Sequence, residues 1–218
     1  MNENTIEKNP MLQAALRALE SNLHPVPVEK NGEYSLVPWE KYRTTRPTRE
    51  EVIEWFSGQQ DAILGIITGT FFGIMAIELE RGHDPWPPPG CELISSCVVE
   101  TPDGTLQYYY MSGSGIKTCY GEIARGVNVL EKGGYIIIPP SHVNGNPYRY
   151  RKGSIEVAGY IPPYWLDEKL KMIRKKQGRK VIFDSNGARI MRKKRRKKKS
   201  LDYPKYFENP LFKRPENG

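Results

Sequence analysis

The order of patterns along this amino-acid sequence predicts an α+β (α/β) protein with a mixed, mainly antiparallel sheet and flanking helices. Two segments with helical patterns come first, and a series of short β-rich runs separated by tight turns follows them. This order is typical of the class. The chain has 218 residues and no internal repeat, so it is long enough for one ample domain with an appendage.

Two helices are predicted near the start of the chain. Asn9 and Pro10 have the residue types of an N-cap and a first helical position. Leucines at helical spacing follow them, namely Leu12, Leu16, Leu19 and Leu23. A second helix is predicted after Thr48, because Glu51 stands three residues later and completes a capping box.

The predicted strands follow in neighbouring runs. The segments "AILGIITG" and "GIMAIELE" are joined by Thr68-Gly69-Thr70. The segment "LISSCVVETPDGTLQYYYMSG" predicts a hairpin that turns at Asp103-Gly104. The segment "GVNVLEKGGYIIIPPS" predicts a second hairpin, which turns at Gly133-Gly134.

Cysteine use and hydropathy indicate the compartment. Cys91, Cys97 and Cys119 form neither an even set nor a C-x-x-C pair, which indicates a reducing environment. No apolar run approaches 18 residues, and no basic-then-apolar segment opens the chain. We therefore expect no membrane span, no signal peptide and a cytoplasmic location in the host cell.

The positive charge is concentrated near the C-terminus. Residues 169–199 hold sixteen Lys or Arg and one acidic residue, whereas the remaining residues hold 17 basic and 24 acidic side chains. The sequence therefore predicts a mildly acidic domain at 9–165 and a basic, partly disordered tail at 166–218. A short helix is expected to continue from Tyr164-Trp165.

Eight consecutive basic residues in the tail form the candidate nucleic-acid contact. Such a run binds phosphates through charge, without reading the base sequence. A nuclear address and a solvated extension are the alternatives. The run consists of Arg192, Lys193, Lys194, Arg195, Arg196, Lys197, Lys198 and Lys199.

Glu78 and Glu80 stand two residues apart at the end of an apolar run. In a strand they point to the same face, where two carboxylates repel each other unless a cation or water neutralises them. From the residues alone, the pair is either a metal site or the solvated side of an ordinary strand.

Eight segments stand in a recognisable order between about Leu12 and Trp165. They are "LHPVPV", "LVPWEKY", "PTREEVIEWF", "ILGIITG", "GIMAIELE", "TPDGTLQYYY", "GVNVLEKGGYIIIPPS" and "PYRY". This series resembles the bifunctional DNA primase/polymerase (prim-pol) domain of the archaeo-eukaryotic primase superfamily. The resemblance implies that superfamily's fold and a role in DNA replication on a virus or plasmid.

The resemblance also implies two-metal nucleotidyl transfer, in which acidic side chains hold divalent ions and a histidine contacts the nucleotide phosphates. The acidic pair falls on Glu78 and Glu80, the histidine position on Gln107 and the last acidic position on Asn128. Glu78 and Glu80 are therefore the candidate ligands for Mg²⁺ or Mn²⁺. Without the resemblance, Gln107 and Asn128 would be ordinary polar strand residues.

Three of these four positions depart from the family pattern. Glu78 is one methylene longer than the usual Asp, Gln107 cannot carry the charge of a histidine, and Asn128 has no negative charge. Three functions remain open: a DNA-replication protein with a degenerate site that binds nucleic acid and nucleotide, an active primase that tolerates Mn²⁺, and a non-enzymatic scaffold that binds through its tail.

Partners and cofactors follow from the same resemblance. DNA or RNA, nucleotides and a helicase on another chain are the expected partners, because the sequence has no phosphate-binding loop of a helicase motor. Zinc is not expected. His83, Cys91, Cys97 and Cys119 match no standard zinc spacing.

Overall fold

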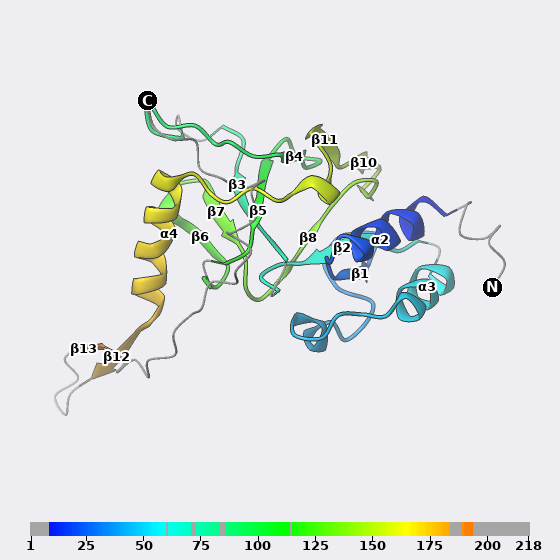
Figure 1. Cartoon of the computed structure of the whole chain (residues 1–218), viewed down its shortest axis with the longest axis horizontal. Coiled ribbons are helices and arrows are strands. Elements are labelled where there is room, and N and C mark those ends of the chain that lie inside the picture. Colours follow the sequence, from blue (N-terminus) through cyan, green and yellow to red (C-terminus); the bar gives the residue numbers. More distant parts are fainter. Residues whose placement is uncertain are drawn as a thin grey trace, which may run out of the picture. The chain divides into compact units, whose positions relative to one another are not determined.

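The structure is a computed structural model of the chain, and it describes residues 9–59, 61–70, 73–82, 86–113, 115–183 and 189–193. The chain divides into two compact units, Met1–Gln177 and Gly178–Gly218. The first unit contains the helices and the two larger sheets (Figure 1). None of the helices in the described part of the chain has the length and hydrophobicity of a membrane span.

Two helices near the start of the first unit begin at the caps that the sequence predicts. Helix α2 (Pro10–Glu20) follows Asn9, whose side chain accepts a hydrogen bond from the backbone N–H of Leu12 at 3.0 Å. Helix α3 (Arg49–Gly58) follows Thr48, and both hydrogen bonds of the capping box with Glu51 are present. Both predicted helices are confirmed. A short 3₁₀ helix, η1 (Glu40–Arg43), lies between them.

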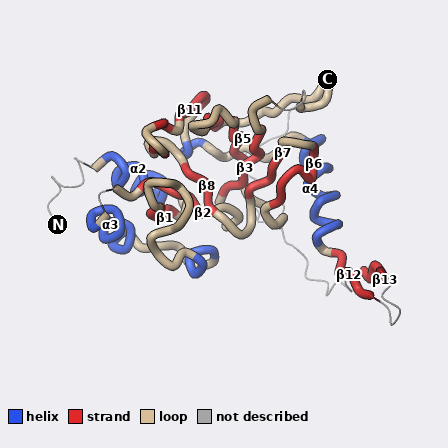
Figure 2. Tube along the Cα trace, turned by 180° about the vertical axis from the view of Figure 1, so that it is seen from behind, coloured by secondary structure: helices blue, strands red, loops and turns tan. Residues whose placement is uncertain are grey.

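A three-stranded antiparallel sheet packs against these helices. Its order is β1 (Pro25–Val28), β2 (Ile63–Ile67) and β8 (Tyr135–Ile137). One face shares a core with α2 and α3, and the other face forms a smaller core around Tyr42. Every residue of β2 is buried, as expected for an apolar strand covered on both faces. Figure 2 shows α2 and α3 beside this sheet.

A six-stranded sheet is the larger sheet of the first unit. Its neighbouring strands pair antiparallel throughout, so the α+β class is confirmed. The predicted hairpin at Asp103-Gly104 is also confirmed, because Glu100 pairs with Leu106 across this turn. The strands, in spatial order, are β11 (Arg149–Lys152), β4 (Cys97–Glu100), β5 (Leu106–Met111), β3 (Ile74–Leu79), β7 (Val127–Leu130) and β6 (Cys119–Ala124).

The predicted hairpin at Gly133-Gly134 is wrong. β7 belongs to the six-stranded sheet, where β3 and β6 occupy both of its edges, whereas β8 pairs with β2 in the other sheet. The glycines carry the chain from one sheet to the other. Thr68 holds this crossing, because its backbone N–H donates to the carbonyl oxygen of Gly134 at 3.1 Å. Alternating apolar residues predicted both strands correctly, but the pattern carries no information about which strand is the partner.

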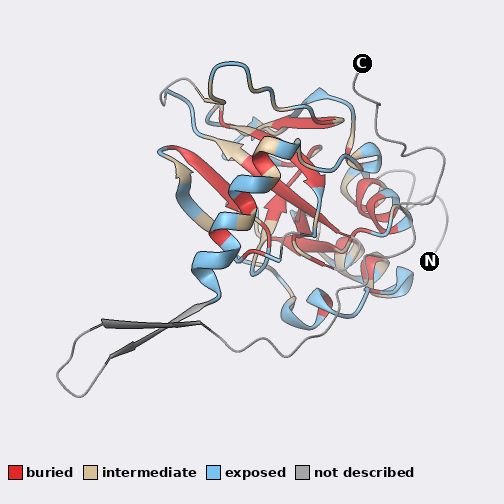
Figure 3. Ribbon diagram, turned by 60° about the vertical axis from the view of Figure 1, so that its left-hand side comes forward, coloured by how far each residue is buried: buried red, intermediate tan, exposed pale blue. Residues whose placement is uncertain are grey.

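The six-stranded sheet separates two cores. Ala76, Tyr109 and Leu130 pair across the central strands and face the core that contains α2 and α3. Ile77 and Val129 face the opposite core, which helix α4 (Tyr164–Gln177) closes. Buried residues of α4 lie on one side of the helix and exposed residues on the other (Figure 3).

Helix α4 was expected to begin near Tyr164-Trp165, and it does. Its residues Leu166, Leu170 and Ile173 are buried against the sheet. The domain boundary expected at 165/166 therefore falls inside this helix, and the first compact unit extends to Gln177. Three short elements also belong to this unit: β9 (His142–Val143), β10 (Asn146–Pro147) and η2 (Ile155–Val157).

In the second unit, the described residues form an antiparallel strand pair, β12 (Arg179–Phe183) and β13 (Arg189–Lys193). The basic run at 192–199 was expected to be disordered. Arg192 and Lys193 are instead the last two residues of β13. Lys194, Arg195, Arg196, Lys197, Lys198 and Lys199 lie outside the described residues.

Candidate functional site

Three of the four predicted catalytic positions form one row across three adjacent strands of the six-stranded sheet. Glu78 on β3 pairs directly with Gln107 on β5 and with Asn128 on β7. Residues that pair directly across antiparallel strands point to the same face, so these side chains are neighbours. Glu80 follows β3 by one residue and remains in register, because its backbone N–H donates to the carbonyl oxygen of Gly126 at 2.9 Å. The four positions therefore meet on one face.

Hydrogen bonds join all four side chains into one network. Gln107 Nε2 donates to Glu78 Oε2 at 2.9 Å. Asn128 Nδ2 donates to Glu78 Oε1 and to Glu80 Oε1, both at 2.9 Å. One amide nitrogen thus lies between two carboxylates, at the point where a cation would otherwise relieve their repulsion.

The orientation of each amide is set by a further partner. The backbone N–H of Gly121 on β6 donates to Asn128 Oδ1 at 3.1 Å. Because a peptide N–H can only donate, this bond places the amide hydrogens of Asn128 towards the glutamates. Both ends of the Gln107 amide also have a partner, since the Tyr109 hydroxyl donates to Oε1 at 2.9 Å and Nε2 donates to Glu78.

Burial distinguishes the amides from the carboxylates. Gln107 is 5% exposed and Asn128 is 3% exposed, whereas Glu78 is half-buried and Glu80 is exposed. Tyr109 is fully buried, and this burial raises its pKa well above the ordinary value. The phenol therefore keeps its proton and remains a donor to Gln107 at all physiological pH values.

These donors do not fit a two-ion cage. A cage of that kind requires several anionic oxygens around closely spaced ions, but Asn128 and Gln107 direct N–H groups at the glutamates. Among the described residues, no group of three or more His, Cys, Asp or Glu side chains is placed to hold a metal ion. A single Mg²⁺ or Mn²⁺ ion at Glu78 and Glu80 stays a prediction.

Two residues that support this network were not predicted as site residues. Tyr109 stands two residues after Gln107 on the same face, and this spacing was the available signal. Gly121 has a φ of +67° in an irregular part of β6, which brings its N–H to Asn128.

The other candidate residues are not brought together. Cys97 packs in the core with α2, whereas Cys119 packs on the opposite face of the six-stranded sheet. Cys91 is a further free thiol, and His83 lies outside the described residues. Arg192 and Lys193 belong to the second unit.

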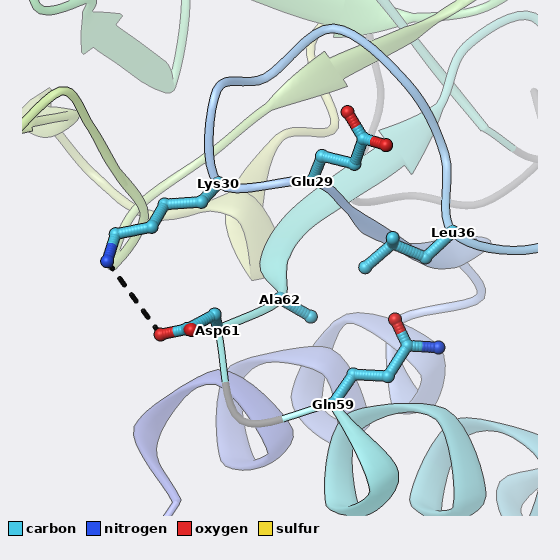
Figure 4. Close-up of a pocket in the computed structure, with 6 residues that line it drawn as sticks. All are labelled: Glu29, Lys30, Leu36, Gln59, Asp61 and Ala62. Atoms are coloured by element: carbon cyan, nitrogen blue, oxygen red, sulfur yellow. Dashed lines mark ion pairs between the residues drawn. The ribbon is translucent and has the colours of Figure 1, made fainter.

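A shallow hollow of about 340 Å³ lies beside the three-stranded sheet (Figure 4), and none of the predicted site residues lines it. Lys30 and Asp61 form an exposed ion pair at its edge, at 3.8 Å. Its charged side chains are solvated, and we assign it no function. The lining residues are Glu29, Lys30, Leu36, Gln59, Asp61 and Ala62.

The comparisons with known proteins agree with this fold. Residues 15–165 match the family described as bifunctional DNA primase/polymerase, N-terminal. A comparison with curated proteins gave no significant match. The family match covers more than half of the chain and supports a primase/polymerase-like role in DNA replication, with nucleic acid and nucleotides as the general class of ligand. The chain belongs to the bifunctional DNA primase/polymerase (Prim-Pol) family.

Proposed function

We propose that this protein is a replication protein of a virus or plasmid that binds nucleic acid and nucleotide but has a degenerate nucleotidyl-transfer site. One observation carries the proposal. The amide nitrogen of Asn128 donates to both Glu78 and Glu80, so the two carboxylates are joined by a side chain of the protein itself. The shape of the site is kept by this network in the absence of a metal cage.

The expected loss of activity follows from the charges. In two-metal transfer, the ions stabilise the attacking and leaving oxygens as charge develops. An amide N–H supplies only a partial positive charge at one point. Removing one group that stabilises a transition state costs about 3–4 kcal/mol, or two to three orders of magnitude in rate. Substitutions at 107 and 128 remove both the ionisable imidazole and one carboxylate of the family pattern.

A second candidate function, primer synthesis with Mn²⁺, is favoured by the same geometry. Glu78 Oε1 and Glu80 Oε1 both lie 2.9 Å from a single atom, Asn128 Nδ2. The two carboxylates therefore converge on one point. An ion that displaced the amide would find two anionic oxygens there.

Primer synthesis and primer extension, each measured with Mg²⁺ and with Mn²⁺, separate the two functions. We expect no product from the unaltered chain with either metal. The triple variant Glu78→Asp, Gln107→His and Asn128→Asp restores the family residues, and we expect it to gain a low activity.

Glu80→Ala, introduced into the triple variant, is the matched control and should abolish that gain. Robust synthesis by the unaltered chain, lost on Glu80→Ala alone, would contradict the degenerate site and establish the active enzyme instead.

A further inference from the structure

The end of the six-stranded sheet opposite the candidate site carries a loop built around a buried acid. Glu131 follows β7 and is 0% exposed. Its Oε1 accepts hydrogen bonds from the Ser112 hydroxyl at 2.9 Å and from the backbone N–H groups of Gly113 and Gly115, both at 3.2 Å. Its Oε2 accepts from the N–H of Ile116 at 2.8 Å. The loop after β5 is therefore fixed in place by one carboxylate.

Two lysines flank this fixed loop. Lys117 and Lys132 form an isolated parallel bridge, and the N–H of Lys132 donates to the carbonyl oxygen of Ile116 at 3.1 Å. Both lysines are exposed. Like charges on paired strand positions repel each other. The pairing therefore brings two positively charged residues to neighbouring backbone positions, where their charges repel each other.

The last turn of α4 adds further cations at the same place. Gln177 accepts a hydrogen bond from the N–H of Lys117 at 2.8 Å and donates to its carbonyl oxygen at 3.0 Å. A Cβ built on Gly115 would lie 3.7 Å from Lys132 Nζ and 4.0 Å from Arg174 Cδ. The side chains of Lys132 and Arg174, which come from two separate parts of the chain, thus lie beside Gly115.

The helix dipole explains only part of this charge. Basic residues in the last turn of a helix are stabilised by the negative end of its dipole, which accounts for Arg174, Lys175 and Lys176. Lys176 also pairs with Glu122 at 3.2 Å. Neither argument applies to Lys117 and Lys132, which lie outside the helix. Their pairing, between the loop after β5 and the extension of β7, is the feature that indicates an anionic ligand.

We propose that Lys117, Lys132 and Arg174 form a second nucleic-acid contact, the loop patch. This patch binds the phosphate backbone at the end of the sheet opposite Glu78 and Glu80. This inference depends on the proposed function, in which the protein binds nucleic acid. Asn128 and Lys132 stand four residues apart on β7 and its extension, a distance of about 13 Å along a strand. The loop patch is therefore separate from the candidate site. It is also separate in sequence from the basic run at 192–199.

Salt-dependent binding of the full chain to duplex DNA tests the loop patch. Each phosphate contact contributes about 0.9 to the slope of log affinity against log salt. The double variant Lys117→Gln and Lys132→Gln should reduce that slope by about 1–2. Fluorescence anisotropy over a series of salt concentrations measures it. If the double variant does not fold, each single variant should reduce the slope by about 0.9.

Lys30→Gln with Lys152→Gln is the matched control, because it removes the same charge from exposed positions elsewhere on the first unit. This control should leave the slope close to that of the unaltered chain. Equal slopes in the two double variants would overturn the loop patch while leaving the proposed function intact.

Two other outcomes have different meanings. An unaltered chain that binds no oligonucleotide at all would contradict the proposed function itself. A double variant that loses affinity only for vesicles containing phosphatidylserine, with unchanged DNA binding, would overturn the nucleic-acid contact and indicate a lipid surface instead.

Discussion

The two ends of the six-stranded sheet neutralise their carboxylates in different ways. At one end, Glu78 and Glu80 accept hydrogen bonds from the side-chain amides of Gln107 and Asn128. At the other end, Glu131 accepts from the backbone of the loop after β5 as well as from Ser112. Side-chain donors can be replaced by single substitutions, whereas backbone donors are part of the fold. The first arrangement can therefore change with function, and the second is fixed by architecture.

The largest loss of stability is expected when Glu131 is replaced. Glu131→Ala removes the acceptor of three loop N–H groups and leaves the N–H of Ile116 buried without a partner, so the free energy of unfolding should fall by about 3 kcal/mol. Denaturant unfolding measures it. Glu122→Ala is the control, since Glu122 is exposed and makes a surface ion pair worth about 0–1 kcal/mol. A loss below about 1 kcal/mol at Glu131 would show that the loop does not depend on the buried acid.

A smaller loss of stability is expected when a carboxylate is added at position 128. Asn128→Asp removes the bridging amide and places a third carboxylate beside two others, so without metal it should destabilise the protein by about 1–2 kcal/mol. Mn²⁺ should then raise the melting temperature of this variant more than that of the unaltered chain. Thermal melting with and without Mn²⁺ measures both effects.

Asn146→Asp is the control for this comparison, because Asn146 is exposed on β10. An identical response to Mn²⁺ in the two variants would mean that a carboxylate in place of the Asn128 amide does not rebuild an ion site. It would also weaken the argument that the glutamates converge on a cation position.

The smallest loss of stability is expected at Tyr109, whose hydroxyl donates to Gln107. Tyr109→Phe removes the donor to Gln107 Oε1 and should destabilise the protein by about 1 kcal/mol. Tyr120→Phe should change the free energy of unfolding very little, since Tyr120 is 70% exposed. If the two variants unfold at the same denaturant concentration, the side chain of Gln107 does not depend on Tyr109 for its orientation.

The sequence alone determined the local elements and the positions of the candidate site. Asn9, Thr48 with Glu51 and the turn at Asp103-Gly104 each act over a few residues, so their effect is visible in a short stretch. The eight segments that resemble the family also assigned Glu78 and Asn128 to the same site. Their meeting on one face of the sheet agrees with that placement.

Only the tertiary structure decided how the polar groups are paired. The direction of the Asn128 amide depends on Gly121, which lies on a neighbouring strand and reaches it through an irregular register. The adjacency of Lys117 and Lys132, and the crossing of Gly133-Gly134 between two sheets, depend in the same way on strand partners that are distant in the chain. Alternation in a strand sets which face a residue occupies, but it does not choose the partner strand, because many pairings bury the same apolar face equally well.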